Sequence, residues 1–342
     1  MEPRNSLGEL RHLLLRWFSH TGRPLPNAYK PLAIAYSGGL DSTVLLHLAH
    51  SLWPEAVVAI HVNHGLQVAA SEFEAQCVVT CQQLSVPLNV MRANIELQPG
   101  DSPEERARDA RYLLLRQSAQ AQCAGVLWMA QHADDQAETV LLALTRGAGV
   151  AGLAGMGEVT HHGDLTMGRP LLTVPQNRLR DLGLGQGWAY VDDPTNHDKR
   201  YTRNRIRHDV MPVLSQAFPQ LVTTLARTSR HCAQADALLV DLARVDLLAT
   251  GAPPSLRSLQ SLSVARQTNV LRCWLRDESG RAPSTNQLDE LIKQVAVATT
   301  RGHRIDIKIG NGRVVRNGAQ LVYVPPKLAT GKDGESSGQN EA

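Results

Sequence analysis

Two glycines, three hydroxyl side chains and an aspartate are concentrated in SGGLDST, residues 37–43. The apolar run LAIAY before this segment is typical of a buried strand, and the apolar residues after it recur at helical spacing. Glycines let an anion approach the backbone closely, and the free N–H groups at the start of a helix attract it. The segment is not a Walker A loop, because GxxxxGK[ST] is absent. It predicts a phosphate-binding turn with these candidates: Ser37, Gly38, Gly39, Ser42 and Thr43 as anion contacts, and Asp41 as a Mg²⁺ ligand or partner of the activated phosphate.

Two further polar clusters follow predicted strands, HVNHGLQ (61–67) and AQHADDQAET (130–139). Ligands bind at the carboxyl ends of parallel strands, so the three clusters are expected to form one site. An ordinary turn or helix cap would explain any one of them, since Gly, Ser and Asp favour such positions. The added candidates are His61, Asn63 and Gly65 for a nucleotide, and His132, Asp134 and Asp135 for catalysis.

Strand-like and helix-like runs alternate through the first half of the chain. Strands are predicted at 32–36, 56–64, 87–93 and 126–132, each followed by a helix, near 42–53, 71–85, 102–122 and 134–147. Repeated units of this kind indicate an α/β fold, a parallel sheet with helices on both faces. A glycine-rich run, 147–157, follows as a loop over the site or a plain connector. WAYVDD (188–193) is predicted as a short strand.

From about residue 216 the pattern changes to helices, near 219–248, 263–278 and 284–297. HRIDIKI, RVVR and AQLVYV then have the character of strands, and Asn317-Gly318 predicts a hairpin turn. The expected parts are a catalytic domain, a helical domain that ends in a small antiparallel sheet, and a disordered polar tail: 1–215, 216–326 and 327–342.

Length and composition limit the kinds of protein that this chain can be. A chain of 342 residues suffices for two domains, and a formal net charge of +3 does not by itself indicate a nucleic-acid partner. Basic residues are nevertheless concentrated at 197–209 and 301–316, where they suit contact with phosphates. We find no secretory or membrane-spanning segment. Five cysteines without a CxxC pair indicate a reduced, cytoplasmic setting.

The set of motifs resembles that of the PP-loop ATP pyrophosphatases, which carry SGGxDS after the first strand. Within that group the chain resembles the tRNA(Ile)-lysidine synthetases over residues 32–214. The motifs that carry this closer resemblance are HVNHGLQ, ARDARYLLL (107–115), HADDQAETVLLALTRGAG (132–149), RPLL (169–172) and VDDPTN…YTRNRIRHDVMPVL (191–214). SGGxDS alone marks only the wider group, whereas the ordered set is far more selective.

The resemblance implies an ATP-dependent ligase. ATP, with Mg²⁺, activates the wobble cytidine of an isoleucine tRNA precursor with a CAU anticodon as an adenylate, and pyrophosphate leaves. The side-chain amine of free lysine then attacks the activated carbon and AMP leaves, which gives lysidine. The resemblance also suggests a homodimer, although no part of the sequence identifies a dimer interface.

The resemblance extends to individual residues. Arg108 and Arg111 lie three apart on one predicted helix and suit a phosphate or the tRNA backbone, with a solvated surface as the plain alternative. Of Asp134 and Asp135, one is expected to cap a helix and the other to bind the lysine ammonium or take its proton. The arginine-rich segment supplies the expected tRNA contacts: Arg200, Arg203, Asn204, Arg205 and Arg207.

Two features depart from the family pattern. Many members have two adjacent histidines where this chain has Gln131 and His132. Glutamine forms hydrogen bonds but does not titrate near neutral pH, so a proton transfer there falls to His132 or is absent. Longer relatives also carry a C-terminal domain that grips the acceptor end of the tRNA. Here the domain 216–326 and the segment 199–207 are therefore expected to be the main tRNA contacts.

Three other functions are compatible with the phosphate-binding turn. A tRNA thiolase generally needs a CxxC pair or a catalytic cysteine, and an amidotransferase-type synthetase such as NAD synthetase needs no basic second domain. A binding module with an inactive site would bind ATP without releasing pyrophosphate. The joint presence of Asp41, Arg111, Asp134 and Asp135 disfavours the last, and lysidine synthesis is the leading interpretation.

Overall fold

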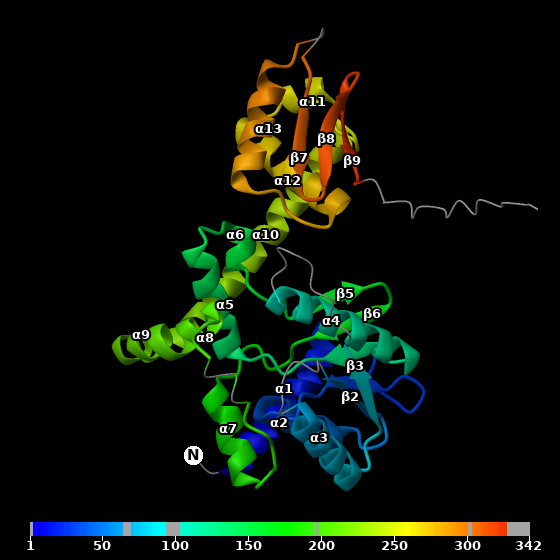
Figure 1. The fold of residues 1–342 in the computed structure, drawn as a ribbon, viewed down its shortest axis with the longest axis vertical. Helices are drawn as coiled ribbons and strands as arrows, with labels where there is room; N and C mark the ends of the chain where they lie inside the picture. Colours follow the sequence, from blue (N-terminus) through cyan, green and yellow to red (C-terminus); the bar gives the residue numbers. More distant parts are fainter. Residues whose placement is uncertain are drawn as a thin grey trace, which may run out of the picture. The chain divides into compact units, whose positions relative to one another are not determined.

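The computed structural model describes residues 3–63, 70–93, 103–193, 195, 198–299 and 303–326. The chain forms two compact units, Met1–Ala233 and Gln234–Ala342 (Figure 1). The larger sheet belongs to the first unit, and a small antiparallel sheet belongs to the second. The predicted tail, 327–342, lies outside the described residues.

A six-stranded sheet forms the centre of the first unit in the described chain, in the order β3-β2-β1-β4-β6-β5. Neighbouring strands pair in parallel except at the edge, where β5 is antiparallel to β6. The bounds are β1 Leu32–Ala35, β2 Val57–Asn63, β3 Leu88–Arg92, β4 Val126–Trp128, β5 Val159–His162 and β6 Leu165–Gly168. The predicted α/β class is confirmed, and β1 to β4 are the four expected strands. The prediction did not include β5 and β6.

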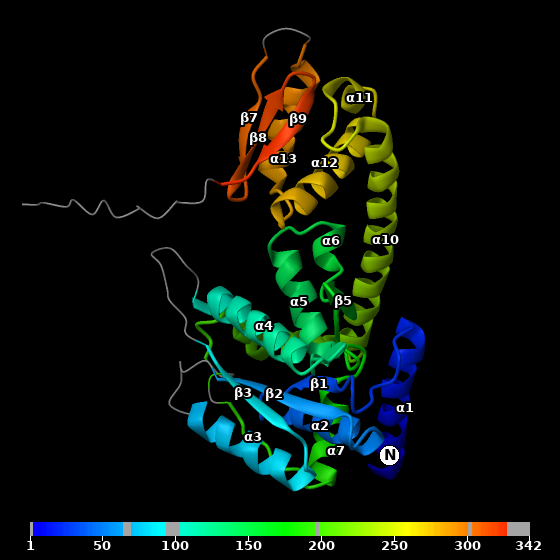
Figure 2. The same cartoon turned by 90° about the vertical axis from the view of Figure 1, so that its right-hand side faces the viewer.

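Alternate residues of each strand face opposite layers of helices, as the two-residue repeat of a strand requires. In β1, Leu32 and Ile34 pack into one core, while Ala33 packs into the other. Figure 2 shows α4 on one face of the sheet and α2 and α3 on the other. The bounds are α1 Pro3–Thr21, α2 Leu40–Leu52, α3 Ala70–Leu84, α4 Pro103–Ala121 and α7 Gln176–Gly185. Residues of α1 and α7 share the core of α2 and α3.

Aromatic rings fasten α1 to the sheet. Trp17 packs edge-to-face on Trp128 of β4 with ring centroids 5.3 Å apart, and Phe18 lies 5.1 Å from the same ring. All three side chains are buried. Gly168 lies against Trp17 and Trp128, where a larger residue would overlap both rings. The first helix is therefore part of the core of this unit.

The carboxyl ends of three parallel strands bring chemically active segments to one edge of the sheet. The turn 37–39 follows β1, Gln131 follows β4, Arg169 follows β6, and α5, Ala133–Thr145, begins at the same edge. The prediction of a strand at 188–193 is wrong. That segment has no sheet ladder, and the Val191 N–H donates instead to the carbonyl of Gly38 at 3.0 Å.

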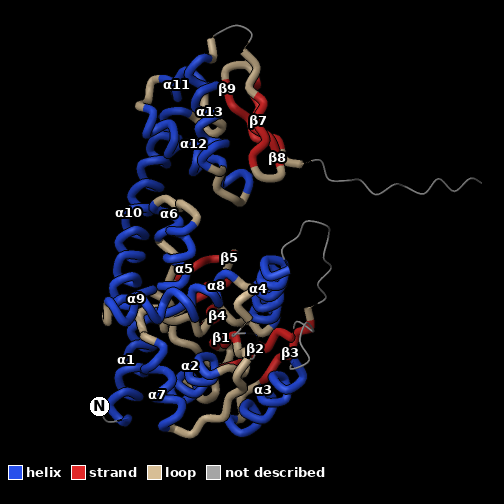
Figure 3. The backbone as a smooth tube through the Cα atoms, turned by 60° about the vertical axis from the view of Figure 1, so that its left-hand side comes forward, coloured by secondary structure: helices blue, strands red, loops and turns tan. Residues whose placement is uncertain are grey.

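A long helix, α10, Leu221–Thr250, starts in the first unit and continues into the second (Figure 3). Near its start, Ser229 is 1% exposed and accepts from Gln136 Nε2 of α5 at 2.6 Å. Ser229 thus belongs to the first unit, and the boundary between the two compact units lies after Ala233, within α10. The functional boundary predicted at 215–216 stays a prediction.

The second unit packs helices on a small antiparallel sheet with the strand order β7-β8-β9. Its elements are α11 Leu256–Gln260, α12 Val264–Ser279, α13 Thr285–Val297, β7 Asp306–Ile309, β8 Gly312–Asn317 and β9 Gln320–Val324. Ser284 and Gln287 form a capping box at the start of α13, and Gly318 turns the last hairpin with a φ of +59°. The expected order of helices followed by hairpins is confirmed. None of the described helices has the length and apolarity needed to cross a membrane.

We expect Gly168→Ala to lower the free energy of unfolding by about 1–3 kcal/mol, because overpacking a dense core forces its neighbours apart. The new Cβ would lie 2.4 Å from Trp17 Cζ2 and 2.7 Å from Trp128 Cδ1. Gly125→Ala is the matched control, since a Cβ there meets no described atom within 4 Å. Urea denaturation measures both variants, and equal stabilities would contradict this account of the core.

Candidate active site

Hydroxyl groups hold the turn after β1 in one shape. Ser37 Oγ lies 2.9 Å from Ser42 Oγ and accepts from the Gly39 N–H at 3.3 Å. Ser42 Oγ and Thr43 Oγ1 each donate to the Gly39 carbonyl at 2.9 Å. Gly39 is the N-cap of α2 and has no side chain to occupy the first N–H groups of that helix. The turn therefore presents backbone donors to an anion.

Gly38 gives this turn its bend, with a φ of +85°. A Cβ at this position would lie 3.1 Å from Cys77 Sγ and 3.3 Å from the carbonyl of Phe73. Glycine is thus required on conformational and steric grounds together.

Asp41 and His132 connect the turn to the start of α5. Asp41 Oδ2 lies 3.4 Å from His132 Nε2 and accepts from Gln176 Nε2 at 3.3 Å. The other oxygen, Oδ1, is buried without a hydrogen-bond partner among the described residues. An unsatisfied buried acceptor is costly, so this oxygen suits a bound cation.

This geometry fits the Mg²⁺ that the sequence predicts at Asp41. In the described part of the chain, no group of three or more His, Cys, Asp or Glu side chains is placed to hold a metal alone. Mg²⁺ is commonly held by one or two carboxylates together with substrate phosphates and water. One free carboxylate oxygen beside an anion-binding turn satisfies that requirement.

His132 is the N-cap of α5 and is 2% exposed. Burial lowers the pKa of its imidazole, but the carboxylates of Asp135, Asp41 and Asp134 outweigh burial and raise the pKa to about 9. A charged ring cannot accept from the Asp135 N–H, which lies 3.5 Å from Nδ1. The cap therefore rests on the Asp135 carboxylate, which accepts from the His132 N–H at 3.2 Å.

The two aspartates of α5 have different surroundings. Burial raises the pKa of Asp135, but the positive charges of His132, Arg203 and Arg207 lower it. Asp134 is more open, with 29% of its side chain exposed against 16% for Asp135. Its Oδ2 accepts from the backbone N–H of Gln176 at 2.7 Å. Asp135 completes the cap of α5 by accepting from the His132 backbone N–H, and Asp134 is the more exposed of the two carboxylates.

Two arginines neutralise a buried glutamate of α5 that the sequence analysis did not single out. Glu138, with 3% of its side chain exposed, accepts from Arg203 Nε at 2.8 Å and from Arg207 Nε at 2.6 Å. Glu138 is three residues after Asp135, which also pairs with Arg203 at 3.0 Å, so helical spacing was the available signal.

The segment that carries these arginines is unusual. It consists of α8, Thr202–Arg205, the π-helical turn η2, Ile206–Val210, and α9, Met211–Ala217. π-Helical turns are frequent at functional sites. The guanidinium groups of Arg203 and Arg207 are engaged by carboxylates of α5, so they help to position that helix. Their contact with tRNA stays a prediction.

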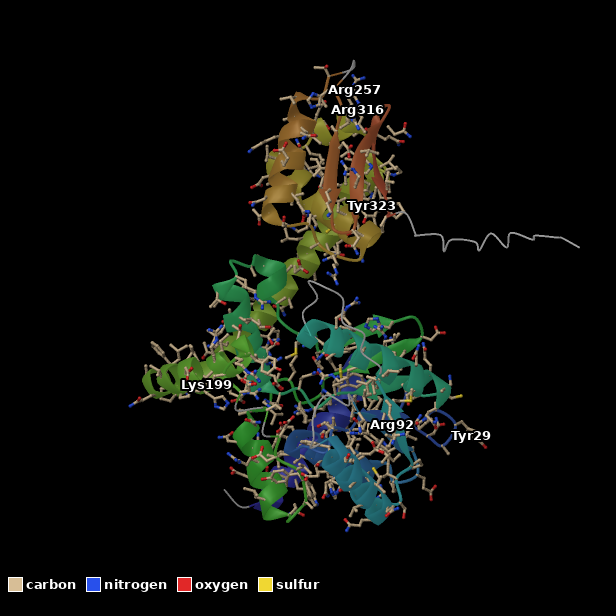
Figure 4. All side chains as sticks on the ribbon, in the orientation of Figure 1. Tyr29, Arg92, Lys199, Arg257, Arg316 and Tyr323 are labelled. Atoms are coloured by element: carbon tan, nitrogen blue, oxygen red, sulfur yellow. The ribbon has the colours of Figure 1, made fainter. Side chains whose placement is uncertain are left out.

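The other residues predicted to contact tRNA divide into buried and exposed ones. Asn204 is 9% exposed and donates to the carbonyls of Thr195 and Asp198 at 2.9 Å, so it fixes the preceding loop. Arg200, with 87% of its side chain exposed, and Arg205 lie at the surface, as does Lys199 (Figure 4). Contact of this segment with tRNA stays a prediction, and Arg200 and Arg205 are its most exposed predicted members.

A further group of cations surrounds Tyr112 of α4. The Arg108 guanidinium carbon lies 5.2 Å from the centre of the tyrosine ring. Burial raises the pKa of Tyr112, but the charges of Arg108, Arg169 and Arg111 outweigh it and lower the pKa. Gln131 bridges this group, with Nε2 3.4 Å from the tyrosine hydroxyl and Oε1 accepting from Arg169 Nε at 3.0 Å.

The predicted nucleotide contacts after β2 are partly described. His61 is 5% exposed, and its Nδ1 lies 3.0 Å from the carbonyl of Tyr36. Burial is the main cause that lowers the pKa of His61. Asn63 donates to Glu74 at 2.8 Å, and Gly65 lies outside the described residues. Nucleotide contact by these residues stays a prediction.

Cys77 and Cys81 have the surroundings of packing residues. Both are buried, and burial raises the pKa of Cys81 to about 12 and that of Cys77 as well. A reactive thiol requires the opposite, a lowered pKa and access to solvent. The pair therefore lacks the chemical character of a sulfur-transfer site.

Two family models match the chain. A PP-loop domain matches residues 17–214, and a TilS substrate binding domain matches residues 255–322. The first match covers the loop, α5 and the arginine-rich segment, and the second lies within the second compact unit.

Three curated relatives that are similar to this chain are all tRNA(Ile)-lysidine synthases. A tRNA(Ile)-lysidine synthase from Polaromonas naphthalenivorans (strain CJ2) is 48% identical, over 86% of this chain and 89% of that protein. Those from Pseudomonas fluorescens (strain Pf0-1) and Burkholderia pseudomallei (strain K96243) are 44% and 42% identical, over 74% and 78% of this chain. The chain spans only 59% and 56% of the length of these last two relatives.

A solved structure of similar fold is the U34-tRNA thiolase NcsA from Methanococcus maripaludis with its [4Fe-4S] cluster. The TM-score is 0.56 at 17% identity, over 67% of this chain and 79% of that one. At this identity the likeness shows the fold alone.

We expect Arg203→Ala to lower the free energy of unfolding by about 2–3 kcal/mol, because it leaves Glu138 and Asp135 short of a buried counter-charge. Arg200→Ala is the matched control, because its ion pair with Asp198 is exposed to solvent and should contribute little to stability. Denaturant unfolding of the two variants measures the difference. Equal losses would show that the inner arginines are not structural.

We expect a Cys77→Ala, Cys81→Ala double variant to keep the wild-type rate of ATP-dependent catalysis within about threefold, because neither buried thiol has a lowered pKa. Steady-state assay of pyrophosphate release measures this, with circular dichroism as the check of folding. Loss of catalysis in a folded variant would restore the thiolase alternative.

Proposed function

This chain belongs to the tRNA(Ile)-lysidine synthase family, and on that premise we propose that it ligates free lysine to the wobble cytidine of the CAU anticodon of tRNA(Ile). The reaction passes through an adenylated cytidine and releases pyrophosphate and then AMP. The observation that supports this most directly is the meeting of Asp41, His132 and Asp134 beside the anion-binding turn.

The first half of the reaction uses the turn 37–43. The backbone N–H groups at the start of α2 bind the ATP phosphates, and the hydroxyls hold the turn in the shape that presents these groups. Asp41 would hold Mg²⁺ through its free Oδ1, and the ion, when bound, neutralises charge on the phosphates. His132 and Gln176 orient the other oxygen of Asp41, which keeps Oδ1 directed to the ligand.

The second half needs a neutral lysine amine, since an ammonium has no lone pair for attack. Asp134 is the carboxylate we assign to bind this ammonium and take its proton, because its side chain is the more exposed of the two aspartates. Asp135 and Glu138 hold the arginines of the segment 202–207 and keep α5 in place.

Contacts to tRNA are assigned to exposed cations. In the first unit these are Arg108 and Arg111 on α4 together with Arg200 and Arg205. In the second unit the exposed cation is Arg257 of α11, and Arg316 of β8, which is half-buried, lies at the same end (Figure 4). Phosphate contacts of this kind weaken with added salt, so tRNA affinity should fall as ionic strength rises. A cytoplasmic location and a homodimer stay predictions.

The proposal is tested by pyrophosphate release from ATP with the purified chain. The additions are isoleucine tRNA precursor, methionine tRNA with the same anticodon, and radiolabelled lysine, each present or absent. Release with label entering only the isoleucine precursor supports the proposal. Release without lysine in RNA would overturn it and direct attention to sulfur donors or ammonia.

We expect Asp41→Asn and Asp134→Asn to separate the two half-reactions. Asp41→Asn should reduce pyrophosphate release by about 100-fold or more, because it removes a charge beside the reacting phosphates. Asp134→Asn should retain release and lose lysine incorporation, because the acceptor of the amine proton is gone. Equal loss of both steps in both variants would contradict these separate assignments.

A further inference from the structure

We propose that Arg169 binds the α-carboxylate of the free amino acid substrate. The inference rests on the proposed function and adds to it the group that selects a free amino acid over an amine. None of the predicted site residues performs this task.

Arg169 is a buried cation whose hydrogen-bond partners are all neutral among the described residues. It is 6% exposed, its Nε donates to Gln131 Oε1 at 3.0 Å, and its Nη1 donates to the carbonyl of Gly157 at 2.7 Å. The hydroxyl of Tyr112 is a further contact. In the described part of the chain no carboxylate forms an ion pair with it.

This arrangement is unlike that of the other inner arginines. Arg203 and Arg207 each reach two carboxylates. Buried charges are normally paired, because desolvation is expensive. An arginine held in place by neutral groups therefore has its charge available for an anion, and its planar fork matches a carboxylate.

The position of Arg169 favours the amino acid over the other anions of the reaction. It follows β6, whereas the phosphate-binding turn follows β1, and β4 lies between them in the sheet. Its burial separates it from a tRNA backbone, which exposed arginines such as Arg108 and Arg200 are placed to meet. Gln131, which holds Arg169, is bonded in the chain to His132 at the start of the helix that carries Asp134.

Lysine has charges at both ends, and this edge of the sheet offers a partner for each. Asp134 attracts the ammonium that must react, and Arg169 attracts the carboxylate. Recognition at both ends would place the reacting amine at one position, which is how a free amino acid is chosen over shorter or uncharged amines.

The test compares lysine with lysinamide, which lacks the carboxylate charge, in the wild-type chain and in Arg169→Lys. In the wild type we expect a KM for lysinamide about 100-fold above that for lysine, since truncating one partner of a buried charge pair has an effect of this order. Arg169→Lys keeps the positive charge but loses the planar guanidinium group that can bind both carboxylate oxygens. It should raise the KM for lysine about 30-fold and reduce the preference over lysinamide.

Arg178→Lys is the matched control, because Arg178 is an exposed arginine paired with Glu9, and it should behave as the wild type. If Arg169→Lys does not fold, Gln131→Met removes the acceptor of Arg169 Nε, and its KM for lysine should rise about tenfold. A rise in the KM for tRNA or ATP in place of lysine would overturn the assignment. So would equal use of lysine and lysinamide by an active wild type. An inactive wild type would instead overturn the proposed function itself.

Discussion

The candidate site depends on the neutralisation of two carboxylates buried in the first turns of α5. Asp135 and Glu138 would be expensive to bury alone, and Arg203 and Arg207 offset that cost from a segment more than sixty residues later in the chain. The same pairing fixes α5, and α5 fixes His132 and Asp134. A local electrostatic requirement thus determines how distant parts of the chain must meet before any chemistry is possible.

Near these ion pairs, two charged side chains lack a full set of partners among the described residues. Asp41 has one carboxylate oxygen without a donor, and Arg169 has a charge without a carboxylate. They lie at the ends of different strands, β1 and β6, and have opposite signs. A folded protein tolerates an unpaired buried charge where a bound ligand supplies the opposite charge.

Much of the fold and site could be predicted because local patterns determined it. Strong apolar runs marked β1 to β4, and SGGLDST marked the anion turn. Four-residue strands such as β5 and β6 carry too little periodicity to detect, and α1 was missed although Leu10, Leu14 and Trp17 share one buried face. Charge pattern also cannot distinguish Arg203, which turns inward, from Arg200, which turns outward, since that depends on a partner far along the chain. The roles of Asp134 and Asp135 likewise required the cap geometry.

The helix α10 belongs to both compact units, and its first turns are secured through Ser229 to Gln136 of the site helix α5. When evolution or an engineer exchanges the second unit between relatives, the splice has to fall beyond these first turns. A hybrid joined ahead of α10 would replace Ser229, the hydrogen-bond partner of Gln136 in the first unit.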